Sequence, residues 1–227
     1  MSRGLLVQLS GYGTDNSPIL DAIGVYPGRF KAIAVIDSKA SDRQLEDLAR
    51  AGVVGVRFNL VSYEPDALSR PGTIELLGRL KALGWFAQVY ADDAQWQQAA
   101  PVLRASGICV LIDHFGVCDV AGGTRQKGFQ AVLGLGRDGQ AAVKLSSPFR
   151  VSRCLTNYAD LDPFVDKLLQ SFGVDNCIWG SDWPFINVPR RPSYADVMAP
   201  LSRWLPSPDD RHRVLARNPA RLFGFGD

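Results

Sequence analysis

An acid that follows an apolar run is the first candidate for chemistry in this sequence. Residues 177–179 are apolar and predict a short buried strand, and Asp182 comes three positions after it. Gly180, between them, is expected to let the backbone turn sharply. In barrels of alternating strands and helices, catalytic groups lie at this end of the strands, so Asp182 is a candidate general base. The alternative is a structural role, in which Asp182 caps the following turn or pairs with an arginine.

Polar residues also stand at the ends of the other predicted strands. In chain order, the residues at the strand ends are Ser10, Asp37, Arg57, Tyr90, His114, Arg150 and Asp182. If the strands are parallel and adjacent, these side chains face one place. A guanidinium group binds a carboxylate through paired hydrogen bonds, so Arg57 and Arg150 together indicate an anionic substrate. Structural alternatives stay open: His114 and Tyr90 could serve packing, and either arginine could pair with a neighbouring acid.

The elements that must position these residues alternate along the chain. Apolar runs predict seven strands, at residues 4–9, 30–36, 53–58, 85–90, 108–112, 142–145 and 177–179. Helical patterns lie between them, among them a helix that Ser41 caps, with Leu45 and Leu48 on its inner face. Such alternation predicts an α/β fold whose strands pair in parallel through right-handed crossovers, in one domain that spans residues 1–227.

A count of seven strands leaves two architectures open. A closed barrel of this kind has eight strands, whereas a doubly wound open sheet accommodates seven. The first strand-to-helix junction, residues 10–14, lacks the spaced glycines of a dinucleotide site, which argues against the open sheet.

Composition excludes several classes of protein. The net charge of +2 and the absence of lysine or arginine runs argue against a nucleic-acid partner. No apolar stretch approaches membrane-spanning length, and the first residues do not read as a signal peptide. The four cysteines show no paired spacing, so neither a zinc knuckle nor a redox pair is indicated, and a cytoplasmic location is expected. Cys109 and Cys177 lie in apolar runs and are expected to be buried.

Five segments carry a resemblance to a known family. They are GYGTDN at residues 11–16, GVRFN at 55–59, IDHFG at 112–116, WGSDWP at 179–184 and NPARLF at 218–223. Together they resemble the amidohydrolase superfamily, in the branch called amidohydrolase family 2, and within it the 2-pyrone-4,6-dicarboxylate hydrolase group, which acts in aromatic catabolism. The resemblance covers essentially the whole chain. The DWP and DHFG segments are fairly specific to the branch, and the arginine segment supports them.

This resemblance implies an eight-stranded TIM-barrel-like fold, (β/α)8, in which the aspartate of the last strand activates water. It implies that Asp182 is the general base and that His114 helps to polarise the substrate carbonyl. The residues whose positions match those that hold the substrate carboxylates are Ser10, Arg57, Tyr90 and Arg150. Tyr63 stands where the group places a further arginine, which implies a substrate with one anionic group fewer, or one bound differently.

The chain also departs from the family pattern. Members carry a His-x-His pair at the end of the first barrel strand, and the two histidines here, His114 and His212, lie elsewhere. The resemblance therefore implies that the first strand and helix are missing, which would explain the count of seven strands. The two sheet edges exposed in this way would invite pairing into a homo-oligomer.

Metal use is not expected. A catalytic zinc needs about three protein ligands. Among the strand-end groups, only His114 and Asp182 are suitable, because Tyr90 stands where metal-using relatives place a histidine. No cofactor is predicted, and zinc is the alternative that the fold family offers.

The predicted function is hydrolysis of a lactone that bears carboxylate, by an amidohydrolase-type enzyme that acts on a small anionic molecule. Three alternatives remain from the sequence: a lactone isomerase, a metal-dependent decarboxylase of the same superfamily, and a catalytically incompetent truncated remnant.

Overall fold

All the strands in the described part of the chain lie in one curved parallel sheet. The computed structural model describes residues 3–226. In spatial order the strands are β1 (Gly4–Val7), β2 (Phe30–Ala34), β3 (Val53–Asn59), β4 (Phe86–Tyr90), β5 (Cys109–Ile112), β6 (Ala141–Lys144) and β7 (Cys177–Ile178). Each strand pairs in parallel with the next strand along the chain. Within the described residues, β1 and β7 form the two ends of this order, so the sheet is a curled seven-stranded barrel that does not close.

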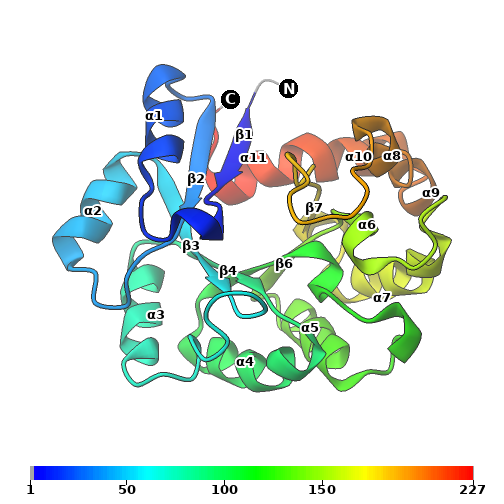
Figure 1. The fold of residues 1–227 in the computed structure, drawn as a ribbon, viewed down its shortest axis with the longest axis horizontal. Coiled ribbons are helices and arrows are strands. Elements are labelled where there is room, and N and C mark those ends of the chain that lie inside the picture. The colour runs from blue at the N-terminus through cyan, green and yellow to red at the C-terminus, as the bar shows by residue number, and fades with distance from the viewer. Residues whose placement is uncertain (1–2, 227) are drawn as a thin grey trace.

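The longer helices lie on the outside of the arc of strands (Figure 1). The longer ones are α1 (Ser17–Val25), α2 (Asp42–Arg50), α3 (Thr73–Ala82), α4 (Asp93–Ser106), α5 (Lys127–Arg137) and α7 (Asp162–Phe172). The shorter ones are α6 (Pro148–Val151), α8 (Tyr194–Met198), α9 (Leu201–Trp204), α10 (Pro208–His212) and α11 (Asn218–Phe223). The predicted α/β barrel-type fold is confirmed. No helix of residues 3–226 combines the length and the apolar character needed to span a membrane.

Local sequence signals explain where several helices begin. Ser41 Oγ accepts a hydrogen bond from the backbone N–H of Gln44, whose side-chain Oε1 in turn accepts one from the backbone N–H of Ser41. Asp92 and Gln95 form the same reciprocal capping box at the start of α4. Each box satisfies two backbone N–H groups that a helix leaves without partners.

The helices near the C-terminal end of the described chain are irregular. Residues 194–204 form two short helices, α8 and α9, separated before Pro200. Helix α10 continues through a π-helical turn at Arg213–Arg217 into α11. Pro219, which has no backbone N–H to donate, comes two residues after this π-helical turn.

The sheet is covered on both faces. Its outer face packs against the helices in the main hydrophobic core. Inside the arc, a second cluster holds Phe86, Leu111, Ala142, Ile178 and Phe223. The ring of Phe223 meets that of Phe86 edge to face at 5.4 Å, so α11 packs against the interior of the barrel. Of the two cysteines expected to be buried, Cys177 is buried, but the expectation is wrong for Cys109, which begins β5 and is exposed.

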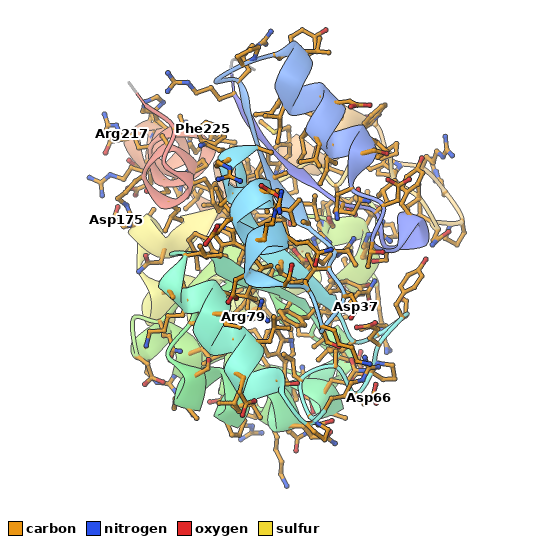
Figure 2. All side chains as sticks on the ribbon, turned by 90° about the vertical axis from the view of Figure 1, so that its left-hand side faces the viewer. Asp37, Asp66, Arg79, Asp175, Arg217 and Phe225 are labelled. Atoms are coloured by element: carbon orange, nitrogen blue, oxygen red, sulfur yellow. The ribbon has the colours of Figure 1, made fainter. Side chains whose placement is uncertain are left out.

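The parallel arrangement gives the molecule two unlike ends. Figure 2 places Asp37 and Asp66, which follow β2 and β3, on one side, and Asp175 and Arg217 on the other. The polar residues at the ends of the strands therefore belong to one side of the sheet.

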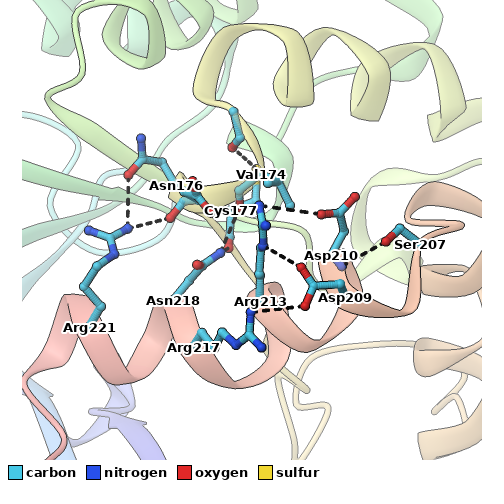
Figure 3. Close-up of polar contacts among 12 residues, drawn as sticks. Val174, Asn176, Cys177, Ser207, Asp209, Asp210, Arg213, Arg217, Asn218 and Arg221 are labelled. Atoms are coloured by element: carbon cyan, nitrogen blue, oxygen red, sulfur yellow. Dashed lines mark hydrogen bonds and ion pairs between the residues drawn. The ribbon is translucent and has the colours of Figure 1, made fainter.

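The C-terminal helix fixes the start of the strand that leads to Asp182. Asn218 is buried, and its side-chain amide donates to the carbonyl oxygens of Val174 and Cys177, each at 2.8 Å (Figure 3). Arg221 donates to the carbonyl oxygen of Asp175 at 2.6 Å. These contacts hold the turn before β7 and so set the position of the residues that follow this short strand.

Candidate active site

Three predicted site residues form a contiguous cluster at the ends of β5, β6 and β7. Arg150 Nε donates to Asp182 Oδ2, and the other carboxylate oxygen, Oδ1, lies 3.8 Å from His114 Nε2. Asp182 and Arg150 are partly exposed, whereas His114 is nearly buried. The structure therefore brings the candidate base and the imidazole together. It also shows that Asp182 pairs with an arginine, which is the structural role that the sequence left open.

His114 is oriented by two neighbours. Its Nδ1 shares a hydrogen bond of 2.9 Å with Oγ of the buried Ser146, and its ring meets the Tyr90 ring edge to face at 5.7 Å. With Nδ1 engaged in this way, Nε2 is the ring atom that faces Asp182. Ser146 was not predicted. Its place directly after an apolar strand run, like that of Asp182, is the signal that could have found it.

The backbone at these strand ends is strained. Residues 114–117 all have positive φ, with His114 at 46° and Val117 at 50°. Ser147 has φ of 56° and Asp182 has φ of 57°. Residues other than glycine adopt this left-handed region at a cost and mostly where the surroundings enforce it, often at functional sites. Gly180 itself is outside this region, and the first left-handed residue after β7 is Asp182.

A buried ion pair lies beneath the cluster. Lys144 Nζ is 2.8 Å from Asp113 Oδ1, and Gln88 Nε2 donates to Asp113 Oδ2 at 3.0 Å. All three side chains are almost fully buried. Asp113 directly precedes His114, and Lys144 comes two residues before Ser146, so the pair joins the strand ends that carry both residues. The sequence analysis missed this pair, although a lysine and an aspartate that end apolar strand runs are a visible signal.

The charge states in the cluster follow from burial and from neighbouring charges. Burial alone would raise the pKa of Asp113, but the positive charge of Lys144 outweighs it and lowers the pKa to about 2. Burial lowers the pKa of His114 below its usual value, and burial raises the pKa of Tyr90. At neutral pH, Asp113 is therefore ionised, the imidazole of His114 is neutral, and the Tyr90 hydroxyl keeps its proton.

These shifts predict how stability depends on pH. Below about pH 6.5, the unfolded chain protonates His114 while the folded protein resists, so the free energy of unfolding falls as pH falls, by at most about 1.4 kcal/mol per pH unit. The stabilising charge of Asp113 is lost only between its unfolded value of 3.8 and about 2. Urea unfolding at pH 7 and pH 5 measures the first effect.

The chain offers a matched control for this experiment. His114→Gln should remove the pH 7 to pH 5 loss, whereas His212→Gln, a change of an exposed residue, should leave it in place. Equal pH dependence in the parent and in His114→Gln would contradict the assignment.

Arg57 stands apart from the other charged groups because it has no acid partner. Its NH1 donates to the backbone carbonyl of Gln8 at 3.0 Å, its Nε is buried and unbonded, and none of the residues 3–226 brings a carboxylate into ion-pairing distance. It nevertheless lies next to the same cluster, because Arg57 pairs in register with Gln88 on β4, whose side chain donates to Asp113, the residue before His114.

The remaining predicted residues differ in their surroundings. Ser10 Oγ accepts a hydrogen bond of 3.0 Å from Asn59 Nδ2. Tyr63 is exposed, and its hydroxyl lies 3.7 Å from the place that a Cβ on Gly11 would occupy. Asp37 is exposed, and it accepts the backbone N–H of Lys39 at 2.7 Å, which stabilises its own turn.

The cluster does not provide the ligands of a zinc site. Across residues 3–226, no three His, Cys, Asp or Glu side chains are placed to hold a metal ion together. His114 and Asp182 are two such groups, and Arg150 already occupies one oxygen of Asp182. A catalytic zinc takes about three protein ligands, so the described residues do not fit this metal.

Comparisons with known proteins agree on one family. The family model described as Amidohydrolase matches residues 1–225. The 4-sulfomuconolactone hydrolase of Hydrogenophaga intermedia is 33% identical over 99% of this chain and 75% of its own length. The 2-pyrone-4,6-dicarboxylate hydrolase of Comamonas testosteroni is 29% identical over 98% of this chain and 76% of its own. A crystal structure of a putative 2-pyrone-4,6-dicarboxylic acid hydrolase from Pseudomonas putida is 29% identical and superposes with a TM-score of 0.91, covering 100% of this chain and 84% of that one.

Proposed function

Because the chain belongs to the amidohydrolase family, we propose that it is a hydrolase that opens a lactone bearing a carboxylate group. Two of its relatives are named as hydrolases of such compounds, a sulfomuconolactone and a pyrone dicarboxylate. The candidate site supports the same chemistry, since it combines a carboxylate, a neutral imidazole and guanidinium groups at the end of the barrel where such enzymes act.

One observation carries the proposal for an anionic substrate. Arg57 is a half-buried cation without a carboxylate partner among the described residues, on β3, whose neighbour β4 ends in the Tyr90 that meets His114 edge to face. A buried or half-buried cation is costly unless it is paired, and a guanidinium group matches the geometry of a carboxylate. A carboxylate on the substrate would supply the missing partner.

The proposed reaction is general-base hydrolysis. Asp182 takes a proton from water while the water oxygen bonds to the ring carbonyl carbon. His114, held through Nδ1 by Ser146, and the protonated hydroxyl of Tyr90 stabilise the negative charge that develops on the carbonyl oxygen. The bond between this carbon and the ring oxygen then breaks, and the proton on Asp182 passes to the leaving oxygen. Ser10 and Tyr63 would line the substrate on the side of β1 and β3.

The proposal also covers metal use, metabolic role, cellular location and assembly. We propose that it proceeds without a metal, because the cluster offers only two suitable ligands within residues 3–226. We also propose a role in the catabolism of aromatic compounds, which rests on the resemblance of the sequence to the 2-pyrone-4,6-dicarboxylate hydrolase group. All four cysteines are free thiols, which agrees with a cytoplasmic location. The free edges of β1 and β7 would allow a homo-oligomer.

A pair of substrates tests the proposal. The parent should open a carboxylated lactone faster than the same ring without the carboxylate. Arg57→Gln should lower kcat/KM for the carboxylated lactone by about 10- to 100-fold, because a hydrogen bond to a charged group contributes about 1.5–3 kcal/mol. The rate with the neutral lactone should stay within about threefold of the parent's.

Product analysis separates this reaction from its alternatives. Nuclear magnetic resonance should show a ring-opened acid, rather than a rearranged lactone or released carbon dioxide. Arg50→Gln removes an exposed arginine that pairs with Asp47 and serves as the matched control. A parent that opens neither lactone, or an Arg57→Gln variant with the parent's substrate preference, would refute the proposal.

A further inference from the structure

We propose that Arg150 is a positioning residue that orients the base Asp182, and that Arg57 alone binds the anionic group of the substrate. This inference rests on the function proposed above. It replaces the substrate-binding role that the sequence suggests for Arg150, and it defines the substrate as a lactone with a single negative charge.

The guanidinium group of Arg150 is fixed by contacts within the protein. Its Nε donates to Asp182 Oδ2, and its NH2 donates to the carbonyl oxygen of Ile186 at 3.0 Å. It also lies over the ring of Phe149 at 5.3 Å, and that ring meets Phe185 edge to face at 5.5 Å. Arg150 therefore links α6 to the segment after β7 at two points, one of them the catalytic carboxylate.

This link matters because the segment that carries Asp182 has an unusual backbone. Asp182, Phe185 and Asn187 all have φ of 57°, in the left-handed region. Such conformations persist where surrounding contacts enforce them. Arg150 contacts the segment at its first strained residue and again at the carbonyl of Ile186, so it restrains both the backbone and the carboxylate.

A count of charges assigns the substrate anion to Arg57. Asp182 compensates Arg150, Asp113 compensates Lys144, and His114 is neutral. One positive charge, that of Arg57, is left without an acid partner among the described residues. A substrate carboxylate on Arg57 breaks no existing ion pair. A carboxylate on Arg150 would compete with Asp182 and remove the donor that orients the base.

The same count applies to the product. Ring opening creates a new carboxylate, so a singly charged lactone becomes a doubly charged product. Arg57 can compensate one of these charges, and the second lies near the carboxylate of Asp182. The site therefore binds the substrate better than the product, which favours release.

Kinetics of Arg150 variants test the positioning role with a monocarboxylated lactone. Arg150→Gln should lower kcat by about 10- to 100-fold, since small misplacements of a catalytic group have effects of this size, while KM stays within about threefold.

Arg150→Lys keeps the charge but cannot make both contacts, and should recover only part of kcat. Methylguanidinium added to Arg150→Ala should restore part of kcat. Arg153→Gln, which removes an exposed arginine that follows α6 and pairs with Asp119, should match the parent. A tenfold rise in KM with kcat retained would show that Arg150 binds the substrate and would overturn the inference.

A binding experiment decides the same question without turnover. Benzoate is a planar ring with one carboxylate, and isothermal titration calorimetry measures its binding to each variant. Binding should be lost in Arg57→Gln and kept within about threefold in Arg150→Gln. The reverse pattern, or loss in both variants with their thermal unfolding unchanged, would refute the division of roles. If the parent does not hydrolyse lactones, the proposed function is refuted. The benzoate experiment would still test, by itself, which of the two arginines binds the anion.

Discussion

Replacing Asp182 by Asn is expected to lower kcat for lactone opening by about 100- to 10,000-fold, the contribution of a general base. The amide cannot take a proton from water, but it has nearly the same shape and its oxygen can still accept from Arg150 Nε. Asparagine also tolerates the left-handed backbone found at this position, so the segment after β7 should keep its conformation. Stopped assays with the monocarboxylated lactone measure the loss.

Two further measurements make this result specific. Benzoate should bind to Asp182→Asn at least as well as to the parent, because Arg57 is unchanged. Asp37→Asn, in the exposed turn after β2, is the matched control and should hydrolyse the lactone at the parent rate. An Asp182→Asn variant that matches the parent in kcat would remove Asp182 from the reaction.

Replacing Lys144 by Met is expected to produce the largest loss of stability. It leaves the Asp113 carboxylate buried without its cation, and removing one partner of a buried pair costs about 3–5 kcal/mol of unfolding free energy. Part of the loss should be recovered as pH falls toward the range where an unpaired buried carboxyl takes up a proton. Urea unfolding at pH 7 measures the effect.

A double variant distinguishes the effect of losing the ion pair from the effect of losing the packing of the lysine methylene groups. In Lys144→Met with Asp113→Asn, both charges are gone, and stability should return to within about 1–2 kcal/mol of the parent, since replacing both partners of a buried pair is often neutral. Lys39→Met, at an exposed position, should change stability by less than about 0.5 kcal/mol. A loss below 1 kcal/mol in Lys144→Met would mean that the pair is solvated rather than buried.

The side of the sheet that carries the site was predictable because strand ends are visible in the sequence. Each apolar run that stops at a polar residue marks such an end, and parallel pairing brings the ends together. His114, Arg150 and Asp182, separated along the chain, meet in this way. The alternation of strand and helix patterns along the sequence also predicted that neighbouring strands pair in parallel.

The contacts inside the site were not predictable in the same way. Nothing in the spacing of residues 146–150 indicates that Ser146 turns toward His114 while Arg150 turns toward Asp182, because the short helix α6 between them decides it. Likewise, a polar residue that ends an apolar run shows where the strand stops but not which side chain it meets. The pairing of Lys144 with Asp113 depends on the register between β5 and β6.

The order of the strands has a consequence for how the molecule is made. Because each strand pairs with the one that precedes it in the chain, every strand–helix unit can dock as soon as it leaves the ribosome, and most pairings join segments that are close in sequence. The contact of Phe223 with Phe86 is different, since it joins the last helix to a strand from the first half. The interior of the barrel can therefore be sealed only after Phe223 has been synthesised.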